Sequence, residues 1–132
     1  MSLSDEERKI IVHLEMEKSY DAYRAAQVLR DASLWSNAAN RLYYALFHAV
    51  CALLVRDGHQ VSTHRGSRVI FGQYYIKTGL LPKEFSIVYS QLETMRENGD
   101  YNYSYETSPQ ELEEKIPLAK EMIDTIAEMV KA

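Results

Sequence analysis

The stretch from Ser36 to Arg56 restricts the possible fold most, because its apolar residues lie on two opposite sides of a helix. One side is broad and consists of Ala39, Tyr43, Leu46, Val50, Leu53 and Leu54. The other side is narrower and contains Tyr44, Ala45, Ala52 and Val55. A helix that is apolar nearly all round is usually buried all round. We therefore expect a central helix whose small Ala45 and Ala52 admit another helix closely, from this chain or from a second copy.

The rest of the chain also has the 3.6-residue period of amphipathic helices. Glycine and proline are scarce, with 5 and 3 residues, and they fall mostly between the periodic segments. This pattern leaves little room for a sheet. We predict an all-α fold in a single domain over residues 1–132, an antiparallel bundle of four long helices plus one shorter helix.

Capping residues place the ends of these helices. Ser4 and Glu7 form a capping box that starts a first helix ending near Ala32. Its expected inward stripe is interrupted by Lys18 and consists of Ile11, Leu14, Ala22, Ala25 and Leu29. Gly58 ends the second helix, and Ser62 or Thr63 caps a short third helix over about 64–76 that Thr78-Gly79 ends. Pro82 starts a fourth helix that ends at Asn98-Gly99. Ser108-Pro109 starts the last helix.

Arg41 and His48 interrupt the narrower apolar side of the central helix. Seven residues of helix turn through nearly two full turns and rise about 10 Å, so the two side chains share one stripe. Burying a guanidinium without a partner would cost several kcal/mol. We therefore expect an anionic group near Arg41.

The charge of the chain is uneven. The net charge is −4, which argues against unspecific nucleic-acid binding. From Leu34 to Lys83, however, six Lys/Arg residues face only one acid, Asp57, while the segments before and after are acidic. This basic middle region could guide a phosphate to a defined place, and the alternative is two acidic solvated helices that flank a middle one.

An arginine and a histidine are sufficient for one kind of phosphate chemistry. Arg41 can only be a donor and a cation, whereas a histidine with a pKa near 6.5 can take and return a proton. Together they could support attack of a ribose 2′-hydroxyl on the neighbouring phosphodiester without a metal or cofactor. The spacing alone is equally compatible with a structural pair.

The residue types around Arg41 and His48 give more evidence than their spacing alone. The run Ala38-Ala39-Asn40-Arg41-Leu42-Tyr43-Tyr44-Ala45-Leu46-Phe47-His48-Ala49 resembles the signature of the HEPN family, an Arg followed after four to six residues by a His. Further similarity lies in Thr63-His64-Arg65-Gly66, in residues 71–79, and in Arg96 with Asp100-Tyr101, in the order seen in the HEPN branch often encoded beside small nucleotidyltransferases.

This resemblance implies a helical bundle that forms a homodimer through the helix face carrying Arg41 and His48. It implies a metal-independent endoribonuclease, acting as a toxin that a small nucleotidyltransferase partner holds in check. By position, Arg41 would bind and polarise phosphate and His48 would act as general acid and base.

Seven further residues are candidates for contact with RNA or a nucleotide: Asn40, Tyr44, His64, Arg65, Arg96, Asp100 and Tyr101. Each also has an ordinary structural interpretation. Tyr44 could stack on a base or pack in an interface. Arg96 and Asp100 are one helical turn apart and could simply pair or could brace the site. Tyr101, with Tyr103 and Tyr105, could form a stacking rim or pack onto the bundle.

Other function classes have less support. One cysteine, Cys51, excludes an intramolecular disulfide, and with no signal peptide we expect a cytoplasmic protein. The apolar run over residues 43–55 is too short to span a bilayer, and we expect neither a metal site nor membrane association. The alternative to an enzyme is a helical module that binds a nucleotide or partner. Leu42, where many active relatives have a polar residue, favours the module, whereas His48 favours the enzyme.

Overall fold

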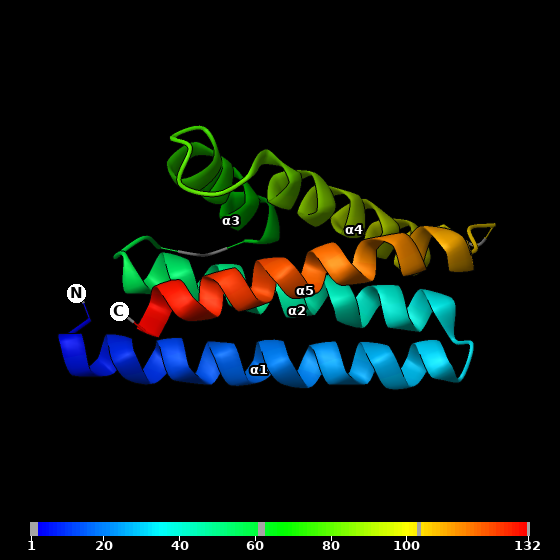
Figure 1. Cartoon of the computed structure of the whole chain (residues 1–132), viewed down its shortest axis with the longest axis horizontal. Helices are drawn as coiled ribbons and strands as arrows, with labels where there is room; N and C mark the ends of the chain where they lie inside the picture. Colours follow the sequence, from blue (N-terminus) through cyan, green and yellow to red (C-terminus); the bar gives the residue numbers. More distant parts are fainter. Residues whose placement is uncertain (1–2, 61–62, 103, 132) are drawn as a thin grey trace.

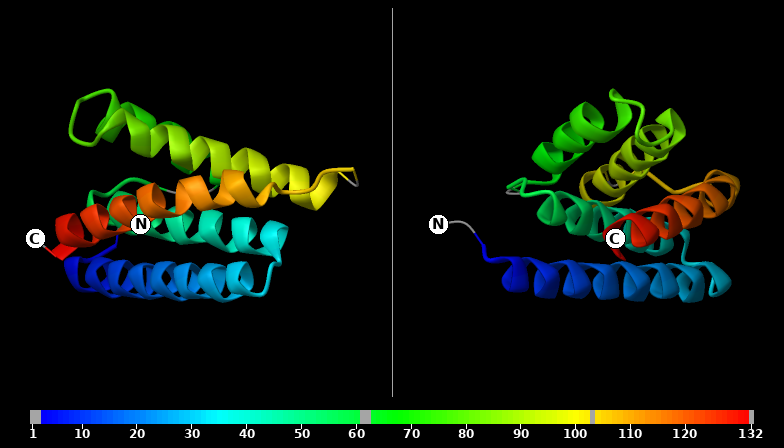
Figure 2. Two further views of the ribbon diagram at one scale, coloured as in Figure 1. Left: turned by 45° about the vertical axis from the view of Figure 1, so that its right-hand side comes forward. Right: turned by 60° about the vertical axis from the view of Figure 1, so that its left-hand side comes forward.

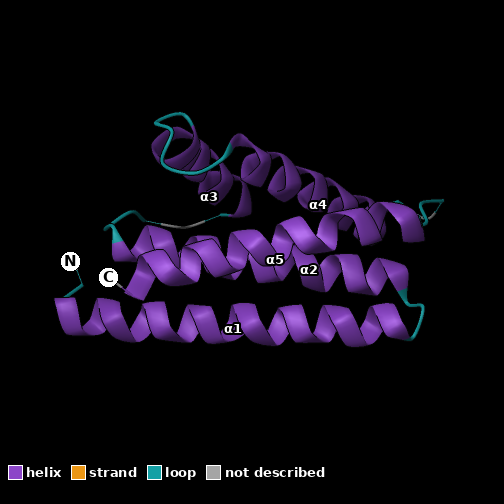
Figure 3. Ribbon diagram, viewed as in Figure 1, coloured by secondary structure: helices purple, strands orange, loops and turns teal. Residues whose placement is uncertain are grey.

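The computed structural model describes residues 3–60, 63–102 and 104–131. Its elements are α1 (Asp5–Asp31), α2 (Trp35–Arg56), α3 (His64–Phe71), the π-helical η1 (Gly72–Ile76), α4 (Lys83–Tyr101) and α5 (Pro109–Lys131). Within these three ranges every regular element is helical, as Figure 3 shows. The prediction of an all-α helical bundle is therefore confirmed.

The helices lie in three tiers, with α2 in the middle (Figures 1 and 2). Helices α1 and α2 form an antiparallel hairpin, α5 runs along α2, and α3 and α4 cover the side away from α1. Helix α2 contacts α1, α3, α4 and α5. The broad apolar side predicted for α2 is at most 1% exposed throughout. Helix α2 is thus the core helix of the bundle.

Length and hydropathy alone would also allow α2 to cross a membrane. It has 22 residues, and the mean hydropathy of its most apolar window is 1.3. We expected its apolar run to be too short for this, and that argument was too strict. The burial of 67% of this window inside the bundle is the better guide, because a core helix has the same composition as a membrane span.

The narrow apolar side of α2 packs on α1 of the same chain. Ala45 and Ala52 are fully buried, and the Ser19 hydroxyl of α1 donates a 2.7 Å hydrogen bond to the carbonyl oxygen of Ala45. Of the two occupants expected for these small residues, the one next to them is therefore α1, and not a second copy.

The buried side of α1 is not the stripe that the sequence predicted, but one rotated around the helix axis. The buried residues are Val12, Met16, Ser19, Ala22 and Ala26. Of the predicted stripe only Ala22 is buried, and Leu14 is 53% exposed. Helix α1 has apolar residues over more than one stripe, so its periodicity alone did not show which stripe faces α2.

Most predicted helix ends agree with the structure. The Ser4–Glu7 capping box is formed, and the Thr63 hydroxyl accepts a hydrogen bond from the backbone N–H of Gly66. Gly58 and Gly79 both have φ +82°, which favours glycine. The alternative cap Ser62 lies outside the described residues. Helix α4 continues to Tyr101, three residues beyond the predicted end at Asn98.

Candidate active site

One strip of α2 stays partly exposed between α1 on one side and α3 and α4 on the other. Along it lie Asn37, Asn40, Arg41, Tyr44, Phe47 and His48, at the spacing of one helix side, and Val55 follows two turns after His48. Arg41 and His48 therefore lie on the only side of α2 that its neighbours within the described chain leave open. The shared stripe inferred from their spacing is present.

Arg41 is held in place without a carboxylate. Its Nε and Nη2 atoms donate hydrogen bonds of 3.1 and 2.8 Å to Oδ1 of Asn40. Its guanidinium carbon lies 4.8 Å from the centre of the Tyr44 ring. Across residues 3–60, 63–102 and 104–131, no carboxylate oxygen lies within 4.0 Å of this guanidinium. Three of its five N–H donors are thus left for a ligand.

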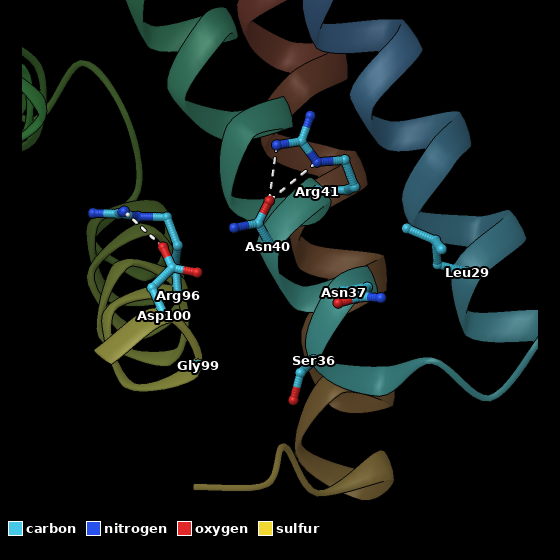
Figure 4. A pocket seen from close by; sticks show the side chains of 8 residues that line it. All are labelled: Leu29, Ser36, Asn37, Asn40, Arg41, Arg96, Gly99 and Asp100. Atoms are coloured by element: carbon cyan, nitrogen blue, oxygen red, sulfur yellow. Dashed lines mark hydrogen bonds and ion pairs between the residues drawn. The ribbon is translucent and has the colours of Figure 1, made fainter. Parts of the chain in front are cut away.

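Arg41 opens into a pocket of about 290 Å³ between α2 and α4. Its lining residues are Leu29, Ser36, Asn37, Asn40, Arg41, Arg96, Gly99 and Asp100. Figure 4 shows α2 in the middle, with Arg96 and Asp100 on α4 to one side and Leu29 on α1 to the other. The carboxylate in this pocket, Asp100, pairs with Arg96, so the anionic partner expected for Arg41 is not found within the described residues.

Arg96 is the second cation of this pocket. Its side chain is 11% exposed, and its Nη1 donates a 3.3 Å hydrogen bond to Asp100 Oδ2. Its guanidinium carbon lies 5.1 Å from the Tyr43 ring centre and 6.0 Å from that of Tyr44. Its Nε is buried and has no hydrogen-bond partner among the residues that the structure describes. Arg96 therefore both pairs with Asp100 and borders the pocket, so the two expected roles are compatible.

His48 forms a hydrogen bond to Glu15 of α1. The His48 Nδ1 atom lies 2.7 Å from Glu15 Oε2, and both side chains are only about one-fifth exposed, 22% and 19%. The Lys18 ammonium lies 3.9 Å from the other oxygen of this carboxylate. Sequence reasoning missed Glu15, because it is 33 positions from His48. The available signal was a pair of polar residues, Glu15 and Ser19, one turn apart on the side of α1 that meets α2.

An aromatic cluster joins His64 to the same face of α2. The His64 Nδ1 atom lies 2.9 Å from the Tyr43 hydroxyl, and the His64 ring centre is 4.3 Å from that of Phe47. Burial, and then the charge of Arg96, lower the pKa of His64 below its ordinary value. Burial also raises the pKa of Tyr43, so this hydroxyl keeps its proton at neutral pH and can donate it to His64.

Tyr44 lies at the centre of the candidate residues. Its ring is 4.8 Å from the Arg41 guanidinium carbon, and 6.2 and 5.6 Å from the ring centres of His48 and His64. Tyr44 is partly exposed. Its ring could therefore receive a base stacked beside the two groups that could act on phosphate.

Five sequence candidates do not line the pocket. Of these, Tyr44, His48 and His64 belong to the aromatic cluster, whereas Arg65 and Tyr101 do not. Arg65 is exposed in the first turn of α3, and Tyr101 is 80% exposed in the last turn of α4. Neither residue lines the pocket beside Arg41. Tyr103 of the expected tyrosine rim lies outside the described residues.

Two other residues singled out in the sequence are buried. Leu42 is 0% exposed in the hydrophobic core, so its side chain does not line the pocket. Burial, and then the negative charge of Glu15, raise the pKa of Cys51 to about 12. The thiol is therefore protonated at neutral pH and a poor nucleophile. Leu42 and Cys51 thus serve packing.

Comparison with known proteins agrees with this arrangement. The HEPN domain family matches residues 12–130, which is nearly the whole described chain. The chain belongs to the HEPN family. The resemblance stated from the sequence is therefore confirmed.

Three HEPN-family relatives cover most of the chain. A UPF0332 protein of Thermotoga maritima is 33% identical over 114 residues, which span 82% of this chain and 86% of the relative. "Putative toxin MJ0605" of Methanocaldococcus jannaschii is 29% identical and covers 81% of this chain and 79% of its own length. "Putative toxin MJ0142" of the same archaeon is 28% identical, covering 74% and 67%.

Proposed function

We propose that this HEPN protein is a metal-independent endoribonuclease and that it acts as a toxin. The observation that carries the proposal is the open strip of α2. On it, an arginine with no carboxylate partner among the described residues and a histidine that is about four-fifths buried flank one tyrosine ring. The toxin role is supported by the two archaeal relatives whose names include that word.

In the proposed reaction His48 transfers protons and Arg41 binds the phosphate. His48 takes the proton of a ribose 2′-hydroxyl, and the freed oxygen forms a bond to the adjacent phosphorus. The bond from phosphorus to the 5′-oxygen breaks, and that oxygen takes a proton from an imidazolium. Arg41 donates N–H groups to the phosphate oxygens, whose negative charge is stabilised as the new bond forms. The products are a 2′,3′-cyclic phosphate and a 5′-hydroxyl.

The pocket beside Arg41 is the proposed place for the RNA backbone. Arg41 and Arg96 supply two cations against the single carboxylate of Asp100. Asn40 fixes the Arg41 guanidinium through two hydrogen bonds, so less freedom is lost when a phosphate binds. The Tyr44 ring would hold a base beside this phosphate.

We further propose that two copies form the active enzyme and that a small nucleotidyltransferase restrains it. A second His48, supplied across a symmetric interface, would provide the imidazolium that protonates the 5′-oxygen. The partner proposal rests on the similarity in Thr63-His64-Arg65-Gly66 and around Arg96 to the HEPN branch encoded beside nucleotidyltransferases.

The test is incubation of the purified protein with labelled RNA in EDTA. We expect wild type to cleave, and Arg41→Ala and His48→Ala to reduce the rate at least about 100-fold, since general acid–base catalysis and oxyanion stabilisation each contribute that much. Product ends should be 2′,3′-cyclic phosphates.

Matched controls come from α1. Arg24→Ala and His13→Ala remove an exposed arginine and an exposed histidine that both pair within the same helix. These variants should cleave like wild type. Cleavage that survives either site substitution would overturn the mechanism. No cleavage by wild type would favour a binding module that uses the same pocket.

A further inference from the structure

The Glu15–His48 pair carries an inference beyond the two signature residues, and it rests on the proposed function. An ionised carboxylate has no hydrogen to donate, so a 2.7 Å contact requires a proton on His48 Nδ1. In neutral His48 the other ring nitrogen, Nε2, then keeps its lone pair. The contact therefore selects the form of the histidine that can accept a proton at Nε2.

We propose that Glu15 is a positioning residue that holds His48 as the Nδ1–H tautomer and stabilises the imidazolium formed during RNA cleavage. Its carboxylate would face the ring from α1, while the substrate approaches from the open side of α2. A carboxylate placed behind a histidine in this way orients the ring and offsets the positive charge that develops on it.

Packing makes this pair more than a surface contact. His48 and Glu15 are each about four-fifths buried, so water screens the contact less than it would at an open surface. The ring centres of Tyr44 and Phe47 lie 6.2 and 5.4 Å from that of His48. Rotation of the imidazole would thus disturb both neighbouring rings as well as the hydrogen bond.

Charged and titratable groups surround the pair on several elements. Lys18 lies beside Glu15 on α1, and its ammonium favours the ionised carboxylate. The Cys51 thiol on α2 is close enough to respond to the charge of Glu15. His64 on α3 responds to His48 and, more strongly, to Arg96 on α4. A change in the pH profile must therefore be assigned to His48 directly, by spectroscopy.

Helix α1, which carries Glu15, contains a second histidine–carboxylate pair for comparison. His13 and Glu17 form a second histidine–carboxylate contact, 3.0 Å between Nε2 and Oε1, and their side chains are 72% and 60% exposed. This contact uses the other ring nitrogen and lies on the surface. It is a solvated pair with which the Glu15–His48 contact can be compared.

The experiment combines nitrogen NMR of the imidazole rings with cleavage assays. Long-range proton–nitrogen spectra of labelled wild-type protein should show neutral His48 as the Nδ1–H tautomer. In Glu15→Gln this preference should be lost, while the fold remains. Glu17→Gln is the matched control and should leave the His48 signals unchanged.

Kinetics then connect the tautomer to the reaction. Glu15→Gln should lower the cleavage rate about 10- to 100-fold, less than the loss of His48 itself. Glu15→Asp, which keeps the charge at a shorter reach, should restore part of the rate. In a His48→Ala background, Glu15→Gln should have no further effect, because a residue that acts through His48 has nothing left to position.

The outcomes separate this inference from the proposed function. If wild type does not cleave RNA, the proposed function fails, and the NMR spectra alone decide whether Glu15 fixes His48. Neutral His48 in the Nε2–H form, or a Glu15→Gln variant that cleaves like wild type with the same pH profile, would overturn the positioning role.

Discussion

The guanidinium groups of Arg41 and Arg96 lie 4.8 and 6.0 Å from the centre of one ring, that of Tyr44. Two cations near one ring repel each other, and within the described part of the chain the Asp100 carboxylate bonds to Arg96 and not to Arg41. The buried, unpartnered Nε of Arg96 shows that its hydrogen-bonding capacity is not fully used. A phosphate between α2 and α4 would relieve the repulsion.

Arg96→Gln should therefore weaken the dependence of RNA binding on salt. Each phosphate contact to a single strand contributes a slope of about 0.7 in a plot of log affinity against log salt concentration. We expect the variant to lose about that amount, measured by fluorescence anisotropy in a His48→Ala background that does not cleave. The control Arg24→Gln removes an exposed arginine outside the pocket and should keep the slope. An unchanged slope in Arg96→Gln would remove Arg96 from the site.

At the scale of the element, the hairpin of α1 and α2 builds the site. Helix α1 fills the narrow side of α2 at Ala45, and the same helix brings Glu15 to His48. The small side chains of Ala45 and Ala52 permit this close approach. Ala45 and Ala52, which appear only structural, thus determine how near α1 lies to His48, the proposed general base.

Ala45→Leu tests this packing. Adding three carbons to a fully buried position should lower the free energy of unfolding by about 1–3 kcal/mol. Urea unfolding should show the same loss at low and high protein concentration, since the contact lies within one chain. Ala32→Leu, at an exposed position after α1, is the control and should have little effect. A loss that depends on protein concentration would instead place Ala45 in an interface between copies.

The sequence predicted where the helices lie along the chain better than it predicted how each helix is rotated and which residues contact one another across helices. Periodicity and capping residues placed the helices and the buried face of α2, because these depend on local spacing. The α1 stripe was wrong, since Val12 and Met16 compete with Ile11 and Leu14 as the inward side. Likewise the strip with Arg41 and His48 followed from helix geometry, whereas Glu15 did not, because a contact across 33 positions depends on how two helices rotate against each other.

At the scale of the whole molecule, partly exposed apolar residues of α1 and α2 lie next to one another. Ile11, one turn before Glu15 on the same side of α1, is partly exposed. It lies beside the open strip of α2, where Tyr44 and Phe47 are also partly exposed. Covering this area with a second copy would bury apolar surface and bring two sets of Arg41 and His48 together.

Ile11→Glu should therefore weaken the proposed dimer. A charge at the edge of an apolar interface costs desolvation and, in a symmetric contact, acts twice. Analytical ultracentrifugation should show a wild-type dimer that dissociates at least about tenfold more readily in the variant, a change of about 1.4 kcal/mol. RNA cleavage should fall in parallel and recover as protein concentration rises.

Ile87→Glu is the matched control for this interface. Ile87 is 44% exposed on α4, nine residues before Arg96, and so points to the opposite side of that helix. This variant adds the same charge away from the open strip and should remain dimeric and active. If wild type sediments as a monomer and still cleaves RNA, one copy of Arg41 and His48 suffices, and the 5′-oxygen must take its proton from the same His48 that removed one from the 2′-hydroxyl.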